Sequence, residues 1–343
     1  MQENADRGAA RGVDSFDAIL ELGGPALAAT MQRAEEHLAA VTGQSGVPLS
    51  EHAHATVSAG GKRLRPLLVM LAARSGGGAP DGPEGEEGVI RAAVAVELVH
   101  SATLVHDDII DGASLRRGQP TVSAVAGRHT ALATGDLLFS RAFAELARNG
   151  SVEQLSALSD ASCALAEGEL LQRQDAYADH VEVDRYLRRC ELKTAALFEA
   201  ACRLGAFASR ESSTVLAENL RSFARQIGIA FQILDDVLDV AGPAERTGKM
   251  PGTDLLDGTV TLPLILARER DEDLAVFDLR RLSGPEQAQQ LCDRIAATGA
   301  LDDSRARAMS LVADAKAALP AVLPAGRSVI LEMVADAVVD RYR

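Results

Sequence analysis

The chain has 343 residues, of which 47% are apolar and only 3% aromatic, so it can bury a sizeable core that must be aliphatic and rich in alanine. Its 35 basic and 49 acidic residues give a net charge of −14, which argues against nucleic-acid binding and against polybasic contact with anionic lipid. Charged residues interrupt every apolar run before the roughly 20 residues of a spanning helix, and neither a signal core nor a CxxC motif is visible. We therefore expect a cytoplasmic protein without a transmembrane segment.

The predicted elements are almost all helices. Residues 1–13 are polar and rich in Gly and Ala, which predicts a disordered N-terminal segment. Over residues 14–343, residues of high helix propensity dominate, and apolar residues recur three and four positions apart. The clearest predicted helices are Leu27–Val41, Val89–His106, Ser151–Leu171, Thr214–Val240 and Asp302–Leu319. We expect one all-α domain, a helical bundle, over residues 14–343.

One segment inside this domain does not have the composition of a helix. Ser75–Gly88 contains six glycines, two prolines and four acidic residues, so it cannot bury apolar surface. Helical sequence resumes on both sides, so we predict a mobile loop between helices at residues 75–88 rather than a domain boundary.

The first candidate ligand-binding motif is Gly60–Pro66, which reads GGKRLRP. It places three cations within four residues, beside two glycines that let the backbone approach a ligand closely. A basic turn on the surface is the alternative interpretation.

Two Asp-Asp-x-x-Asp clusters lie inside strongly apolar predicted helices. Residues four apart share a helix face, so Asp107 projects beside Asp111, and Asp235 projects beside Asp239 in the same way. Bare carboxylates in such surroundings would repel each other and be costly to bury. Divalent cations relieve both problems, and Mg²⁺ typically takes one or two carboxylates together with phosphate oxygens. A solvated acidic face is the alternative for one cluster, but two clusters flanked by Leu, Ile and Val favour a metal site.

Cations follow the acidic clusters along the chain. They are Arg116, Arg117, Lys193 (beside Thr194) and Lys249. In a chain of net charge −14, cations gathered near metal-binding acids indicate a polyanionic ligand held by metal and cation clamps. His100 lies seven residues before Asp107 and therefore on the same helix face, either as part of this site or as a buried structural histidine.

Six motifs occur in order: GGKRLRP, LVHDDIID, RRG, KT, FQILDDVLD, and TGKMPGTDLLDG leading into TLPLI. In order and spacing they resemble the trans-type polyprenyl diphosphate synthases, and the similarity covers roughly residue 20 to the C-terminus. The resemblance implies an all-α bundle of the isoprenoid synthase type around a deep central cavity, usually as a homodimer. It also implies condensation of isopentenyl diphosphate with an allylic prenyl diphosphate that is held by three Mg²⁺ ions.

The resemblance assigns roles to three groups of residues. The principal metal ligands it implies are Asp107, Asp111 and Asp235, assisted by Asp108 and Asp239, and Asp236 completes the catalytic carboxylates. The clamp on the allylic diphosphate would consist of Arg116, Lys193 (also grouped with the catalytic residues), Thr194, Gln232 and Lys249. The site for isopentenyl diphosphate would consist of Lys62, Arg65, His100 and Arg117. Metal and cations would stabilise the departing diphosphate, and an apolar cavity would protect the allylic cation from water.

The chain departs from the family pattern at two places. The family usually has Lys after the glycine at Gly258, where this chain has Thr259, so one diphosphate cation is absent. Ala102 and Thr103 stand five and four residues before Asp107, where short-product relatives commonly carry a bulky aromatic residue. The resemblance therefore suggests an open cavity floor and a product longer than fifteen carbons, although Ala102 is about 140° from Asp107 on an ideal helix.

Two other classes of protein were weighed. A non-catalytic or regulatory subunit that binds prenyl diphosphate tends to lose one aspartate motif, whereas this chain has both. A class I terpene cyclase is usually rich in aromatic residues, which stabilise carbocations, and replaces the second aspartate cluster by an Asn/Ser/Glu-type motif. Eleven aromatic residues and a second aspartate cluster favour the chain-elongating prenyltransferase.

Overall fold

The computed structural model describes residues 15–43, 49–77, 82–211, 213–242, 251–319, 323 and 328–340. The segment 1–13, predicted to be disordered, lies outside the described residues, and so does Lys249. The first helices are α1 Ser15–Gly23, α2 Pro25–Thr42, α3 Ser50–Ser58, α4 Leu64–Ser75, α5 Gly82–Ile110, α6 Val122–Ala126, α7 Arg128–Asn149, α8 Val152–Asp175 and α9 Val183–Cys190. They are followed by α10 Ala196–Phe207, α11 Thr214–Ala241, α13 Thr253–Leu256, α14 Leu262–Arg268, α15 Glu272–Ala275, α16 Pro285–Ala297, α17 Ala300–Ala318 and α18 Ser328–Asp340.

Three short elements complete the described structure. A two-stranded antiparallel hairpin pairs β1, Leu115–Arg116, with β2, Gln119–Pro120. A π-helical turn, η1 (Glu191–Ala195), joins α9 to α10, and a 3₁₀ turn, η2 (Leu279–Arg281), follows α15. The prediction of an all-α fold is confirmed, and the five predicted helices correspond to α2, α5, α8, α11 and α17.

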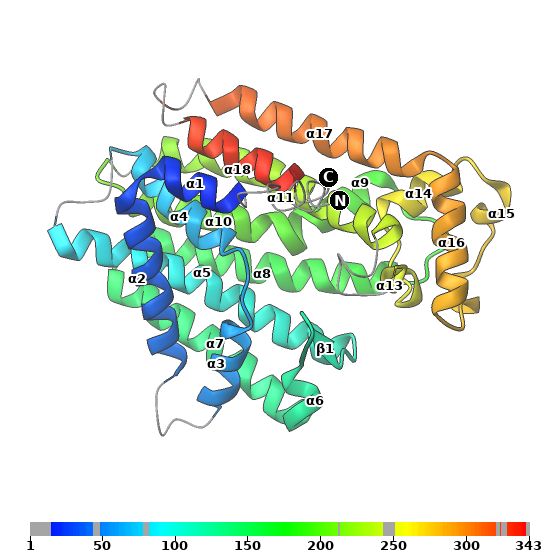
Figure 1. Ribbon diagram of the computed structural model, residues 1–343, viewed down its shortest axis with the longest axis horizontal. Coiled ribbons are helices and arrows are strands. Elements are labelled where there is room, and N and C mark those ends of the chain that lie inside the picture. The colour runs from blue at the N-terminus through cyan, green and yellow to red at the C-terminus, as the bar shows by residue number, and fades with distance from the viewer. Residues whose placement is uncertain are drawn as a thin grey trace, which may run out of the picture.

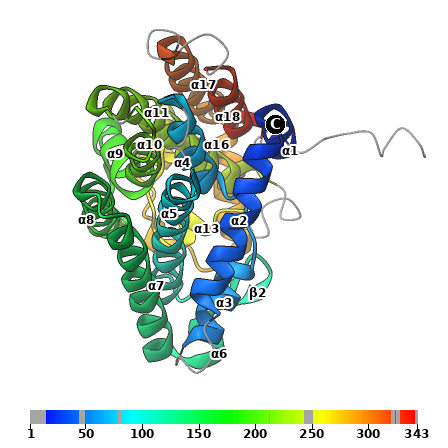
Figure 2. The same ribbon diagram turned by 90° about the vertical axis from the view of Figure 1, so that its left-hand side faces the viewer.

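The helices form a bundle whose long members run side by side (Figure 1). α5 packs against α2, α4, α7 and α10, and α10 packs in turn against α4, α8 and α11. α17 covers α11 from outside, and α18 lies between α17 and α1 (Figure 2). Because α1 and α18 are in contact, the two ends of the described chain meet on one side of the bundle.

Helix α5 is the central helix, and most of its residues from Val89 to Val105 are buried. The stretch Glu84–Ile110 is long and apolar enough to cross a membrane by length and composition, yet 72% of its most apolar window is buried inside the bundle. The apolarity of α5 is therefore that of a core helix, packed on several sides by other helices.

The loop predicted at residues 75–88 is too long, because α4 ends at Ser75, where the loop was predicted to begin, but α5 already begins at Gly82. The acidic residues that suggested a loop stabilise the first turns of α5 instead. Thr30 of α2 donates a hydrogen bond of 2.9 Å to Glu86, and Arg33 pairs with Glu86 at 2.6 Å. Carboxylates near a helix N-terminus also interact favourably with the helix dipole.

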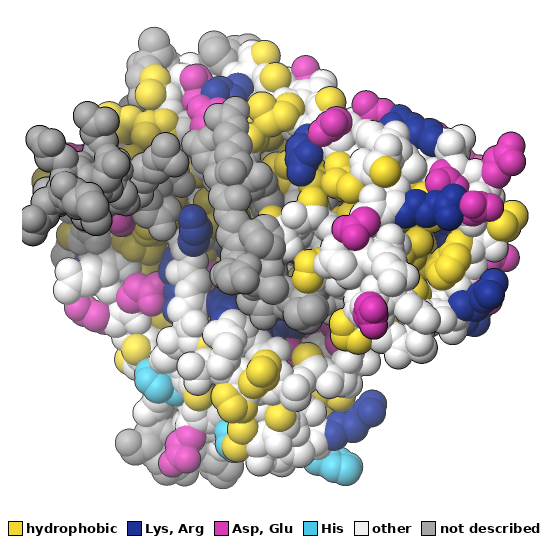
Figure 3. Space-filling view, turned by 45° about the vertical axis from the view of Figure 1, so that its right-hand side comes forward, with side chains coloured by type: hydrophobic (Ala, Val, Ile, Leu, Met, Phe, Trp, Pro, Cys, Tyr) yellow, Lys and Arg dark blue, Asp and Glu magenta, His cyan; other side chains and the backbone are white. Residues whose placement is uncertain are grey.

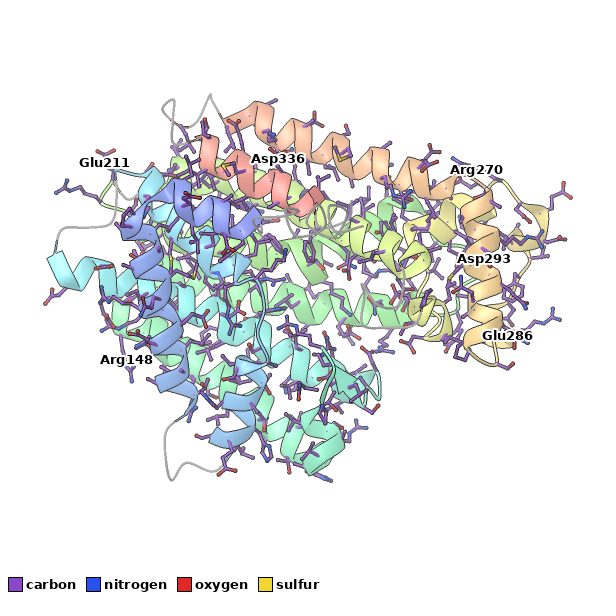
Figure 4. All side chains as sticks on the ribbon, viewed as in Figure 1. Arg148, Glu211, Arg270, Glu286, Asp293 and Asp336 are labelled. Carbon is purple, nitrogen blue, oxygen red and sulfur yellow. The ribbon has the colours of Figure 1, made fainter. Side chains whose placement is uncertain are left out.

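The surface is covered by charges of both signs. On the end of the bundle built by α15 and α16, basic and acidic side chains alternate (Figure 3), and Arg294 pairs there with Asp271 at 2.7 Å. Arg270 and Asp293 project outward from this end (Figure 4), and Arg270 pairs with Asp303. Charges of both signs are therefore mixed on this face of the protein.

Candidate active site

Two adjoining cavities open inside the bundle. The first, of about 270 Å³, lies among α5, α8, α9, η1, α11 and the segment 253–261. The second, of about 390 Å³, lies between the Gly61–Arg65 segment, α5 and the helices α1 and α18. Five residues line both cavities, which therefore form one bipartite site: Arg65, His100, Leu104, Phe231 and Asp235.

The C-terminal half of α5 supplies the first aspartate cluster. Asp107 and Asp111 line the first cavity together with Thr103, because these residues share one helix face. Burial raises the pKa of Asp107 to about 6, although the positive charge of Lys193 opposes this shift. Asp108 lies away from this cavity, buried, and accepts a 2.6 Å hydrogen bond from Arg116 Nε. Asp108 thus anchors the hairpin that carries Arg116.

Helix α11 supplies the second cluster, whose three aspartates differ in role. Asp235 and Asp236 line the first cavity. Asp236 is buried and accepts hydrogen bonds from Tyr186 Oη at 2.6 Å and from Gln232 Nε2 at 2.7 Å, and burial raises its pKa despite them. Asp239 is not among the lining residues; its Oδ2 accepts a 3.2 Å hydrogen bond from the backbone N–H of Asp254.

The allylic clamp predicted from the sequence comes together around η1. Lys193, Thr194, Gln232 and Arg116 all line the first cavity, whereas Lys249 lies outside the described residues. Thr194 Oγ1 donates a 2.6 Å hydrogen bond to Gln232 Oε1, and Gln232 in turn donates to Asp236. This chain of hydrogen bonds fixes the Gln232 amide and couples the KT motif to the second aspartate cluster.

The π turn that carries Lys193 is enclosed by two glycines. A Cβ atom on Gly168 of α8 would lie 2.6 Å from the Lys193 backbone nitrogen. A Cβ atom on Gly228 of α11 would lie 2.6 Å from Ala195 Cα. Both helices therefore approach η1 more closely than any other residue type would allow, and π turns of this kind are frequent at functional sites.

Several polar residues of the first cavity were missed by the sequence analysis. They are Gln172, Arg173, Arg189, Asp254 and Asp257, and Glu169 pairs with lining cations. Asp254 and Asp257 carry a sequence signal, two carboxylates three residues apart in a Gly-rich segment. The residues on α8 and α9 carry none, because only the packing of distant helices turns their side chains toward the cavity.

Two cations of the first cavity, Lys193 and Arg173, are paired with nearby acids. Lys193 Nζ lies 2.5 Å from Glu169 Oε2. Arg173 bridges Asp111 at 2.5 Å and Glu169 at 2.9 Å. An anionic ligand that enters with metal ions would exchange these internal pairs for contacts of its own.

The second cavity collects the cations expected for the other diphosphate. Lys62, Arg65, His100 and Arg117 all line it, beside Arg63 and the acids Glu97 and Asp235. The rest of its lining is largely apolar: Phe16, Ile19, Leu64, Leu104, Phe198, Phe231, Ala337 and Val338. Burial, followed by nearby arginine charges, holds the pKa of His100 well below its ordinary value, so this imidazole is neutral at physiological pH.

The middle cation of the GGKRLRP motif has a structural task. Arg63 has a left-handed backbone (φ 46°), and its guanidinium contacts Glu35 at 2.7 Å and Glu97 at 2.9 Å. It also donates a 2.8 Å hydrogen bond to the Val57 carbonyl. These contacts tie the motif to α2 and α5, so Arg63 is committed to the structure of the motif.

The site fits Mg²⁺ only in combination with a phosphate ligand. Within the described ranges, no three Asp, Glu, His or Cys side chains stand close enough to enclose a metal ion by themselves. Asp107, Asp111 and Asp235 nevertheless face one cavity. Mg²⁺ commonly binds one or two carboxylates and completes its octahedron with substrate phosphate oxygens and water. This donor set therefore suits a metal that arrives with a diphosphate.

The family is shown by comparison with known proteins. The polyprenyl synthetase family model matches residues 47–296, so the chain belongs to the polyprenyl synthetase family. Enzymes of this family are trans-prenyltransferases that use Mg²⁺.

Relatives of known name agree with this assignment. A heptaprenyl diphosphate synthase component 2 of Geobacillus stearothermophilus is 42% identical over 68% of this chain and 70% of its own. A geranylgeranyl diphosphate synthase of Methanosarcina mazei is 37% identical over 83% of this chain and 87% of its own. Among solved structures, a polyprenyl synthase of Caulobacter crescentus complexed with calcium and isoprenyl diphosphate superposes with a TM-score of 0.86 and 35% identity, covering 97% of this chain and 99% of that one.

Proposed function

We propose that this chain condenses isopentenyl diphosphate with an allylic prenyl diphosphate to form an all-trans polyprenyl diphosphate of more than fifteen carbons. The observation that carries the proposal is the pair of adjoining cavities. The first is lined by aspartates of both clusters together with cations, and the second by cations and apolar side chains, with Glu97 and Asp235 as its acids. A diphosphate in each would bring the two hydrocarbon ends together beside Phe231 and Leu104, which line both cavities.

In the first cavity, Asp107, Asp111 and Asp235 would hold the metal, for which we propose three ions. Bound metal would neutralise the charge that develops on the leaving diphosphate. Lys193, Thr194, Gln232 and Arg116 would bind its remaining oxygens, and Lys249 joins this group as a prediction from the sequence. Holding the diphosphate at several points favours ionisation, because these contacts strengthen as negative charge builds on the leaving oxygen.

In the second cavity, Lys62, Arg65 and Arg117 would bind the diphosphate of isopentenyl diphosphate. The carbon–oxygen bond of the allylic substrate breaks, and the electron pair leaves with the diphosphate. The isopentenyl double bond then forms the new carbon–carbon bond, and the departing diphosphate accepts the proton that is lost. His100 is neutral, so it adds no positive charge beside the allylic cation. The apolar side chains that line the second cavity exclude water from that cation.

We also propose a cytoplasmic homodimer. Support comes from the resemblance to the family, whose members are usually homodimers. Apolar side chains exposed along α7 and α8 would be available for the contact, namely Leu132, Val152 and Leu170.

The test is a condensation assay with the purified chain alone, because one relative is named as a component of a synthase. Labelled isopentenyl diphosphate is incubated with geranyl, farnesyl or geranylgeranyl diphosphate, and the products are sized. We expect products longer than fifteen carbons, and their loss when EDTA removes the metal. A cyclised hydrocarbon would indicate a terpene cyclase, and activity that requires a second protein would indicate a subunit role.

Product length gives a sharper test. The structure favours Thr103 over Ala102 as the residue to change. Thr103 lines the first cavity, whereas Ala102 is fully buried and lines neither cavity. Thr103→Phe should therefore shorten the product by placing a ring in the cavity. Ala102→Phe should instead overpack the core and cost about 1–3 kcal/mol of stability, seen as a lower melting temperature. An unchanged product from an active Thr103→Phe variant would place the floor elsewhere.

A further inference from the structure

The first cavity contains a buried cation that none of the sequence motifs predicted. Arg189, near the C-terminal end of α9, is only 4% exposed and lines this cavity one helical turn before Lys193. Buried guanidinium groups are rare unless acidic or carbonyl groups satisfy them, so the contacts of Arg189 are informative.

These contacts leave part of the guanidinium uncommitted. Nη2 donates a 2.6 Å hydrogen bond to the carbonyl of Val260. Nη1 is buried and has no hydrogen-bond partner among the described residues; its ion pair with the buried Asp175 Oδ2 is long, at 3.9 Å. Asp175 Oδ1 accepts a 2.6 Å hydrogen bond from Arg185, and Asp175 Oδ2 is buried without a hydrogen-bond partner among the described residues. The guanidinium carbon lies 5.3 Å from the centre of the Tyr186 ring, which fixes the plane of the group.

Arg189 contacts the residue next to Thr259, the position at which the family usually has lysine. Val260, whose carbonyl accepts from Arg189, lies between Thr259 and Thr261, and both threonines line the same cavity. The guanidinium therefore contacts the backbone segment 259–261, on which the family's usual lysine would stand. Arg246, a cation in the same segment, lies outside the described residues, as Lys249 does.

We propose that Arg189 supplies the positive charge that Thr259 does not, and that its Nη1 contacts the diphosphate of the allylic substrate. The inference rests on the proposed function. A planar guanidinium presents several donors in a fixed fork that matches phosphate oxygens, so Nη1 and Nη2 have separate tasks here. Nη2 holds the Val260 backbone. Nη1 gives up its long contact with Asp175 and binds an oxygen of the allylic diphosphate instead.

The decisive experiment is a charge-relocation series measured by steady-state kinetics, with each substrate varied in turn at saturating Mg²⁺. Arg189→Met should raise KM for the allylic substrate about tenfold, the equivalent of about 1.4 kcal/mol, and change KM for isopentenyl diphosphate less than twofold. Thr259→Lys in the Arg189→Met background should restore the allylic KM to within threefold of wild type. Arg189→Lys, which keeps the charge, should also stay within threefold.

Two variants guard against a purely structural explanation. Asp175→Asn removes the weak acidic neighbour of Arg189 and leaves the cation in place, so it should not raise the allylic KM. Thr259→Lys in the wild-type background should lower the allylic KM less than threefold, because Arg189 already provides the charge. This single variant keeps the proposal testable even where Arg189→Met does not fold.

Three results would overturn the proposal. They are equal rises of both KM values in Arg189→Met, absence of rescue by Thr259→Lys, and a tenfold or larger gain from Thr259→Lys alone. A wild-type chain that forms no condensation product would contradict the proposed function instead. In that case the affinity of the wild type and of Arg189→Lys and Arg189→Met for inorganic pyrophosphate with Mg²⁺, measured by calorimetry, still tests Arg189: equal affinities in all three would refute its role.

Discussion

Replacing Asp107 or Asp235 by alanine should lower the rate of condensation by at least about a hundredfold at saturating Mg²⁺. Both carboxylates line the first cavity, from α5 and α11, and each change removes a proposed metal ligand. Alanine keeps the backbone of these helices favourable, so the variants should fold. The measurement is turnover of labelled isopentenyl diphosphate with an allylic primer, together with the melting temperature.

A matched control for this pair is Asp160→Ala. Asp160 is an exposed aspartate of the neighbouring helix α8, and its 3.5 Å contact with Arg203 lies at the surface. Surface ion pairs of this kind contribute little, so turnover and melting temperature should stay close to wild type. Turnover at a tenth of wild type or more in Asp107→Ala or Asp235→Ala would refute the metal assignment.

The second large effect is expected at Gly168, which touches no substrate. Its Cβ would lie 2.6 Å from the Lys193 nitrogen and 2.9 Å from Lys193 Cα, so Gly168→Ala must displace η1. Overpacking of this kind costs about 1–3 kcal/mol of stability. A shift on the order of 1 Å in the residues that bind a substrate can cost about a hundredfold in rate. We expect kcat to fall ten- to a hundredfold, with the allylic KM rising more than the KM for isopentenyl diphosphate.

Gly88→Ala is the control for this change. Gly88 is also helical, but its Cβ would find no neighbour closer than 3.8 Å, the side chain of Asn149. Alanine at this half-buried helical position should stabilise the protein by about 0.5–1 kcal/mol, with unchanged kinetics. A Gly168→Ala variant whose melting temperature falls while both KM values and kcat stay at wild-type levels would show that the close approach serves packing alone.

Local pattern was sufficient for most of the fold. The periodic apolar stretches predicted α2, α5, α8, α11 and α17, because a long amphipathic or buried helix carries its signal in every turn. The loop at 75–88 was predicted too long, since its glycines and acids suggested disorder while contacts of Glu86 with α2 favour helix. Such contacts join residues more than fifty positions apart, and composition does not report them.

The candidate site was likewise predicted only in part from the sequence. Helix periodicity predicted that Asp107 and Asp111 share a face, and both line the first cavity. It could not separate Asp236, which binds Tyr186 and Gln232, from Asp235, because that difference depends on which neighbour packs against each side of α11. Arg189 was not predicted as a site residue, because no motif surrounds it and only helix packing turns its side chain toward the cavity.

The contact between α1 and α18 has a consequence for the making of the protein. Phe16 and Ile19 of α1 and Ala337 and Val338 of α18 all line the second cavity, so residues more than 300 positions apart build one part of its wall. During synthesis, the helices that carry the aspartates can pack long before the ribosome reaches Ala337. The second cavity, proposed to bind isopentenyl diphosphate, is therefore the last part of the site to mature. A nascent or proteolytically shortened chain that ends before α18 has the carboxylates proposed to bind metal but lacks one side of the second cavity.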